Sequence, residues 1–237
     1  MNIKIILLIT SVFAGFSICQ NSDKRFSLLV GLDYTTTAQI FLNPNSSDII
    51  LRNQAFEIAD LFSPIADFRY SFSDELLFGL SSEYISKSAK GFNQTIVEGS
   101  QVRQIEVEDG VKFIPIEFSV YYLMPFSSDQ FIFTMGGGLG YYFAEHTRVL
   151  GDTEIENTKN NSSIGLLVSV GMEYLIIDNL GIRLDLKFRD PENKISYRYT
   201  DSTATYRGRL LQIPQSTYNS KLNLNGISFV LGVAFHF

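Results

Sequence analysis

Ten charged residues stand out because each lies in a run where apolar residues alternate with small or polar ones. The run Leu180 to Arg189 is the clearest, since Leu, Ile and Phe alternate there with Gly, Arg, Asp and Lys. A period of two places the charges on one face of a β-strand. The acidic members are Asp33, Asp67, Glu83, Glu117, Glu173 and Asp185, and the basic members are Arg69, Arg183, Lys187 and Arg189.

Charges of both signs on inward faces allow three kinds of chemistry. The first is an ion-pair network that fills the interior. The second is the selectivity zone of a narrow polar pore, and the third is a binding or catalytic cavity. A buried charge without a partner is costly, and the interior of an eight-stranded barrel is just wide enough for side chains to fill it. We therefore favour a structural lumen network.

Catalysis and metal binding have little support in the residue pattern. The two histidines, His146 and His236, are expected at opposite ends of the fold and cannot share a site. A Ser–His–acid set built from His146, Glu145 and a loop serine has no supporting spacing. The sequence has no His/Cys cluster, and the carboxylates of EDGV and GDTEIEN lack the spacing of a calcium loop, so we expect solvated loop residues there.

The run Met135 to Gly140 contains four glycines but lacks the Lys and Ser/Thr of a phosphate-binding loop. We interpret its glycines as interior positions that leave room for the long basic side chains of the run Leu180 to Arg189. The sequence therefore predicts no enzyme activity, no catalytic residues, no cofactor and no metal.

The alternation predicts an all-β fold with eight antiparallel strands, each with one apolar and one polar or small face. Their expected ranges are Phe26 to Thr36, Leu61 to Phe72, Leu76 to Ser86, Val111 to Met124, Gln130 to Ala144, Ser163 to Leu175, Leu180 to Arg189 and Gly226 to Phe237. Pro64 and Pro115 lie inside two of them, and each removes a ladder donor, so we expect a bulge or distortion at each.

The connections between these strands alternate between short and long. The short ones contain SDE, PFSSD and IIDN, whereas the long ones run from about 37 to 60, 87 to 110, 145 to 162 and 190 to 221. This alternation is typical of transmembrane β-barrels, which have short turns at one end and long loops at the other. In the fourth loop, ISYRYT and ATYRGRLL either extend the neighbouring strands or form an additional hairpin, which would give ten strands.

The N-terminal segment predicts a secretory signal peptide over residues 1–19, with Lys4 before an apolar core and small residues at Ser17 and Cys19. The barrel domain then spans residues 20–237. A rival interpretation is a lipoprotein acylated at Cys19, although Ile18 is large for that motif. The formal net charge of −6 argues against a nucleic-acid partner.

The last residues, GISFVLGVAFHF, place Phe229, Leu231, Val233, Phe235 and Phe237 on one face and end on an aromatic residue. This end resembles the C-terminal assembly signal of outer-membrane β-barrels. With its strand and loop alternation, the chain resembles the small outer-membrane β-barrel superfamily, which includes OmpA-, OmpX- and OmpW-like barrels and PorT-type proteins of Bacteroidetes.

That resemblance implies a monomeric barrel in the outer membrane of a Gram-negative bacterium. Its partners would be the barrel-assembly machinery, membrane lipid and lipopolysaccharide, whose phosphates Arg198, Arg207 and Arg209 could meet unless these side chains are simply solvated.

The predicted role is structural or surface interaction through the long loops. The alternatives are a passive channel for small solutes, as in OmpW-like proteins, and a secreted ligand-binding barrel with an apolar interior.

Overall fold

The computed structural model describes residues 24–98, 101–160 and 162–237. The predicted signal peptide, with Cys19, lies outside the described residues. In chain order the elements are β1 (Phe26–Phe41), α2 (Ile49–Asn53), β2 (Ala55–Ser71), β3 (Leu76–Glu83), β4 (Ile85–Glu98), β5 (Gln101–Leu123), β6 (Phe131–Leu150), β7 (Thr153–Asn160), β8 (Ser163–Ile177), β9 (Leu180–Arg189), β10 (Glu192–Tyr199), β11 (Thr203–Tyr206), β12 (Arg209–Gln212), β13 (Tyr218–Asn223) and β14 (Ile227–His236).

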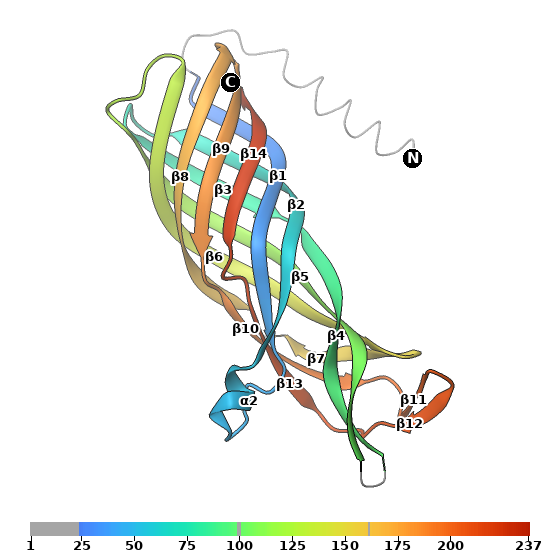
Figure 1. Cartoon of the computed structure of the whole chain (residues 1–237). Coiled ribbons are helices and arrows are strands. Elements are labelled where there is room, and N and C mark those ends of the chain that lie inside the picture. The colour runs from blue at the N-terminus through green and yellow to red at the C-terminus, as the bar shows by residue number, and fades with distance from the viewer. Residues whose placement is uncertain (1–23, 99–100, 161) are drawn as a thin grey trace.

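Eight antiparallel strands form a closed ring, as predicted. Their order is β1, β2, β3, β5, β6, β8, β9 and β14, and β14 pairs with β1 to close the sheet. The start of β1 meets the C-terminus at one rim, where the amide of Phe26 donates to the carbonyl of Phe237 over 3.0 Å. Figure 1 shows this ring with its short turns beside the C-terminus. We call it the membrane ring.

The four expected long loops are largely strands, which corrects the sequence-based interpretation. The outer parts of β1, β2, β5 and β6 continue beyond the membrane ring and meet β4, β7, β10 and β13. We call this second tier the extension; it occupies the end of the molecule farthest from the C-terminus in Figure 1. The ring has eight strands and not ten. β10 continues β9, β13 leads into β14, and the hairpin of β11 and β12 forms a separate two-stranded sheet.

The two tiers have opposite polarity. In the membrane ring, apolar side chains such as Leu166 and Leu231 point outward and are 72 % and 56 % exposed, whereas the charged residues point inward. In the extension, Ile195 and Leu222 are buried inside and Lys194 is exposed outside. An apolar exterior suits lipid and a polar exterior suits water. The inverted polarity of the membrane ring rules out the secreted ligand-binding barrel.

No helix in the described part of the chain has the length and apolar character needed to cross a membrane.

The two strand prolines lie beside the one interruption of the third strand. Tyr84 separates β3 from β4, and its amide donates to the carbonyl of Pro64 over 3.3 Å. On its other side, the β5 ladder stops at Ile116 and resumes at Phe113, on either side of Pro115. The expected distortion is therefore a gap in the ladder, with no shift of register across Pro115.

The outward face of the membrane ring gives a direct prediction for Leu184→Arg on β9. Leu184 is 44 % exposed among other outward apolar residues, and an arginine near the bilayer midplane costs about 2–4 kcal/mol. We expect reduced insertion in a membrane-assembly assay. The control Leu210→Arg, on the β12 hairpin of the extension, should assemble normally because Leu210 is already 68 % exposed outside the membrane ring. Equal assembly of both variants would contradict the assigned orientation.

Candidate functional site: the interior of the barrel

The ten predicted lumen charges all lie inside the membrane ring, and each is at most 5 % exposed. β9 supplies four of them at alternate positions, because its period of two keeps Arg183, Asp185, Lys187 and Arg189 on the inner face. The strands β1, β2, β3, β5 and β8 supply the other six. Each of the ten has at least one ion-pair partner of opposite sign.

The half of the network near the C-terminus centres on two arginines. Arg183 contacts Glu173 at 2.8 Å and Asp67 at 3.1 Å. Arg69 contacts Asp67 at 2.8 Å and Asp185 at 2.5 Å, and its guanidinium stacks 4.0 Å from the ring centroid of Tyr121. Two cations and three carboxylates thus form one continuous chain across the lumen, and His236 extends it by contacting Glu173.

The other half of the network centres on Arg189. Its guanidinium contacts Asp33 at 3.1 Å, Glu117 at 3.1 Å and Glu83, and it donates to the hydroxyls of Thr35 and Ser228. Lys187 adds a second cation, 3.1 Å from Glu117. A buried ion pair is stable only if hydrogen bonds compensate for the water that each ion has lost. Several hydrogen bonds per ion provide that compensation here.

The glycine run on β6 serves the aromatic side chains and the backbone, and not the basic side chains that we expected. A Cβ on Gly140 would lie 2.5 Å from the Tyr142 ring, and one on Gly136 would lie 2.6 Å from the Tyr121 ring. A Cβ on Gly138 would lie 1.9 Å from the backbone oxygen of Phe118. Glycine here lets β5 and β6 approach closely while two lumen tyrosines fill the space.

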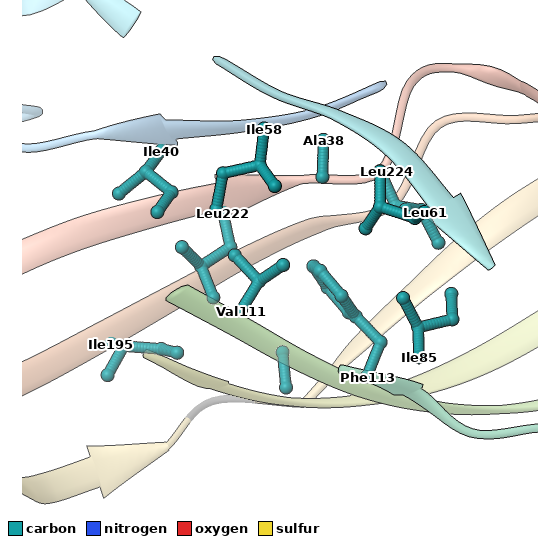
Figure 2. Close-up of a cluster of buried hydrophobic side chains, with 11 residues drawn as sticks. Ala38, Ile40, Ile58, Leu61, Ile85, Val111, Phe113, Ile195, Leu222 and Leu224 are labelled. Atoms are coloured by element: carbon teal, nitrogen blue, oxygen red, sulfur yellow. The ribbon is translucent and has the colours of Figure 1, made fainter. Parts of the chain in front are cut away.

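A cluster of buried aliphatic and aromatic side chains closes the barrel above the charged network. Figure 2 shows these side chains converging from opposite walls of the extension. We call this cluster the apolar plug; it comprises Ala38, Ile40, Ile58, Leu61, Ile85, Val111, Phe113, Ala144, Ile195, Leu222 and Leu224. Only four of its members come from segments expected to be loops, namely Ala38, Ile40, Ile58 and Ile195, and five others lie at the loop-side ends of predicted strands, namely Leu61, Ile85, Val111, Phe113 and Ala144. The sequence analysis missed the apolar plug, although the alternation of Ile195, Tyr197 and Tyr199 in an expected loop was a usable signal.

A buried polar layer follows the apolar plug toward the far end of the extension. His146 on β6 lies 3.1 Å from Asp109 through Nε2 and 3.1 Å from the Ser220 hydroxyl through Nδ1. Arg148 also approaches Asp109, at 3.5 Å. An outer apolar cluster of Ile105, Val107, Leu150, Tyr199, Ala204 and Ile213 covers this layer.

This layer corrects the sequence expectation for Asp109 and shows where Glu145 lies. Glu145 faces away from His146 toward Lys112 and is 54 % exposed, so it forms no Ser–His–acid set. Asp109 of EDGV is buried and paired, and is not a solvated loop residue. A Ser220–His146–Asp109 arrangement does exist, but each of the three is at most 1 % exposed, which leaves no room for a substrate beside the serine.

The polar layer predicts a pH dependence of the extension. Burial lowers the pKa of His146 below its usual 6.5, although Asp109 opposes this shift. The unfolded extension therefore binds a proton more readily than the folded one, so stability is lost as pH falls below about 6.5. We expect protease resistance of the extension to decrease between about pH 7 and pH 5. His146→Gln should flatten this dependence; an unchanged pH profile in that variant would contradict the assignment.

Comparison with solved structures shows the fold. The outer membrane protein OprG of Pseudomonas aeruginosa superposes with a TM-score of 0.63 at 14 % identity, covering 92 % of this chain and 97 % of that chain. The chain has the fold of a small outer-membrane β-barrel. Ail of Yersinia pestis gives a lower TM-score of 0.46 at 9 % identity, covering 91 % of this chain and 100 % of that chain. Neisserial surface protein A also gives a TM-score of 0.46, at 16 % identity, covering 90 % of this chain and 97 % of that chain. No family model and no curated protein matches the sequence.

For an outer-membrane β-barrel, the outward apolar band of the membrane ring is the lipid-facing surface that the fold requires. The short-turn end then faces the periplasm and the extension faces outward, as in other barrels of this type. The interior layers described above therefore lie in sequence along the path from one side of the membrane to the other.

Proposed function

We propose that the protein is a sealed, non-enzymatic barrel of the outer membrane that presents a rigid β-extension for surface interaction. The observation that carries this proposal is the double closure of its interior. The charged network fills the membrane ring, and the apolar plug lies directly above it. Any axial path must cross both layers.

Each layer opposes conduction for a different reason. In the membrane ring, ion pairs with distances near 3 Å occupy the lumen, and separating them would leave buried charges without partners. In the apolar plug, Phe113 and Ile58 are fully buried, and a constriction lined by such side chains excludes water. These two layers support the sealed barrel over the small-solute channel.

The extension supports a surface role. Paired strands hold its outer segments, so fewer degrees of freedom remain to be lost when a partner binds than in flexible loops. We propose lipopolysaccharide and membrane lipid as immediate neighbours and the barrel-assembly machinery as the partner during insertion. Within this proposal, Phe229, Leu231, Val233, Phe235 and Phe237 keep their predicted role as assembly signal, and the ten lumen charges keep their structural role.

Single-channel recording in planar lipid bilayers tests the proposal. Purified, folded protein should insert without discrete conductance steps. Reproducible openings of one size would contradict the sealed barrel and support passive transport of small solutes. Heat-dependent gel mobility of the same sample is the control that folded protein was present.

A further inference from the structure

A hollow of about 350 Å³ lies on the outer wall of the extension, lined by β10, β13, Lys159 of β7 and the segment from Pro44 to Asn53. Four basic residues line it, Arg52, Lys159, Lys194 and Lys221, together with one carboxylate, Glu192. We call it the basic groove. We propose that the basic groove binds a saccharide carrying phosphate or sulfate groups. This inference rests on the proposed surface role and names the ligand class for it.

The strand register brings like charges together in the basic groove. Lys194 on β10 is the direct cross-strand partner of Lys221 on β13, and both side chains lie on the outward face. Like charges in this position destabilise a β-sheet. Glu192 offsets part of the repulsion, at 3.2 Å from Lys221 and 3.9 Å from Lys194. One carboxylate shared by two ammonium groups leaves an excess of positive charge.

Two further cations, Arg52 and Lys159, line the same groove. In the described part of the chain, the side chains of Arg52 and Lys159 take part in no hydrogen bond or ion pair. Lys159 lies on β7 opposite Ser196 of β10, and Arg52 lies in the last turn of α2. Basic residues thus line the groove from α2, β7, β10 and β13, although the whole chain has a net charge of −6. Such a local excess attracts anions.

The uncharged polar groups of the basic groove indicate a ligand that carries hydroxyl groups as well as negative charge. The amides of Asn45, Asn53 and Asn219 and the hydroxyl of Ser196 line the same hollow. Ser196 already donates to Asn219 over 2.8 Å, which leaves the Asn219 amide nitrogen available to a ligand. Guanidinium and ammonium groups bind phosphate or sulfate, while amides and hydroxyls suit sugar hydroxyls. The volume falls within the range of sites for small ligands.

Lys221 is positioned for this role by its packing. Its ammonium lies 4.3 Å from the centroid of the Phe41 ring, and its side chain is only 24 % exposed. A cation held in this way loses less conformational freedom on binding than a free surface lysine. The adjacent Lys194, at 71 % exposed, retains freedom to close over the ligand.

Isothermal titration calorimetry with sucrose octasulfate at low salt tests the basic groove. The matched probe is sucrose, which has the same sugar scaffold without charge. Arg52→Gln/Lys194→Gln removes two groove cations. Lys90→Gln/Lys112→Gln removes two cations elsewhere on the extension, of which Lys90 is exposed and the Lys112 side chain is 43 % exposed. Heat-dependent gel mobility shows that each variant is folded.

We expect the octasulfate to bind and sucrose not to bind. The groove variant should lose affinity by roughly tenfold per removed contact, and the control variant should retain it. Equal losses in both variants, or no binding by the folded parent, would overturn the proposal. Such a failure would not bear on the proposal of a sealed barrel, because single-channel recording tests that proposal separately.

Competition identifies the source of the anionic saccharide. Purified lipopolysaccharide in detergent micelles is added to the octasulfate complex, with a dephosphorylated preparation as control. Displacement by the phosphorylated form alone would assign the basic groove to a neighbouring lipopolysaccharide. Retained octasulfate binding without displacement would assign it to a soluble phosphorylated or sulfated glycan.

Discussion

Replacing Arg189 with leucine should lower the free energy of unfolding by about 3–5 kcal/mol, because this buried cation is an ion-pair partner of three buried carboxylates. Without its guanidinium, Asp33 and Glu83 lose their only ion-pair partner among the described residues, and Glu117 retains only Lys187. Urea titration of the folded protein in lipid vesicles measures the loss.

Arg198→Leu is the matched control for that experiment. Arg198 pairs with Glu156 at 2.9 Å on the exterior of the extension, where both side chains are 58 % exposed. An exposed pair contributes about 0–1 kcal/mol, so this variant should unfold close to the parent. Similar losses for both arginines would show that the lumen network does not depend on Arg189 and would contradict its central position.

Phe113→Ala should destabilise the extension by about 3–5 kcal/mol, since truncating a fully buried phenylalanine leaves a cavity as well as losing apolar burial. Phe113 is 0 % exposed at the centre of the apolar plug (Figure 2). Protease resistance of the extension and urea titration both report on this change. We expect the extension to become susceptible before the membrane ring unfolds, because lipid continues to support the ring.

Phe143→Ala provides the comparison on the same strand wall. Phe143 faces outward, is 47 % exposed and stacks edge-to-face on Tyr141. Its truncation removes surface contacts without opening an internal cavity, so the loss should be clearly smaller. If the two variants behaved alike, the apolar plug would not be a packed core.

The membrane ring was predictable because one physical rule acts along its whole length. Lipid outside and charge inside impose a period of two, and the run from Leu180 to Arg189 displays it without interruption. The partners of each charge were not predictable, since strand order and register decide that Arg189 meets Asp33 across 156 residues of sequence. Sequence spacing carries no such information.

The extension was missed because its polarity reverses. Its strands expose polar residues such as Lys194 and Arg198, and polar segments between membrane strands look like loops. The buried alternation of Ile195 and Tyr197 was visible in ISYRYT, but assigning it required knowing that the ring continues into water. Asp109 and His146 were likewise hidden, because their burial depends on apolar layers built from distant strands.

The polarity reversal also explains how β1, β2, β5 and β6, which run through both tiers, meet lipid in one tier and water in the other. Below the boundary, lipid contributes no hydrophobic force toward the interior, so paired charges fill the lumen. Above it, water drives apolar side chains such as Phe113 and Ile58 inward. The strand walls thereby change from an ion-pair interior to an apolar one as they pass from the membrane ring into the extension.

Gel mobility of the outer-membrane fraction, with and without boiling in detergent, tests most directly whether the chain is a closed membrane barrel. The unboiled protein should be found in that fraction and should migrate faster than the boiled protein, because a compact barrel binds less detergent than an unfolded chain. A protein found only in the soluble fraction, or one whose mobility does not change on boiling, would contradict the membrane-spanning barrel.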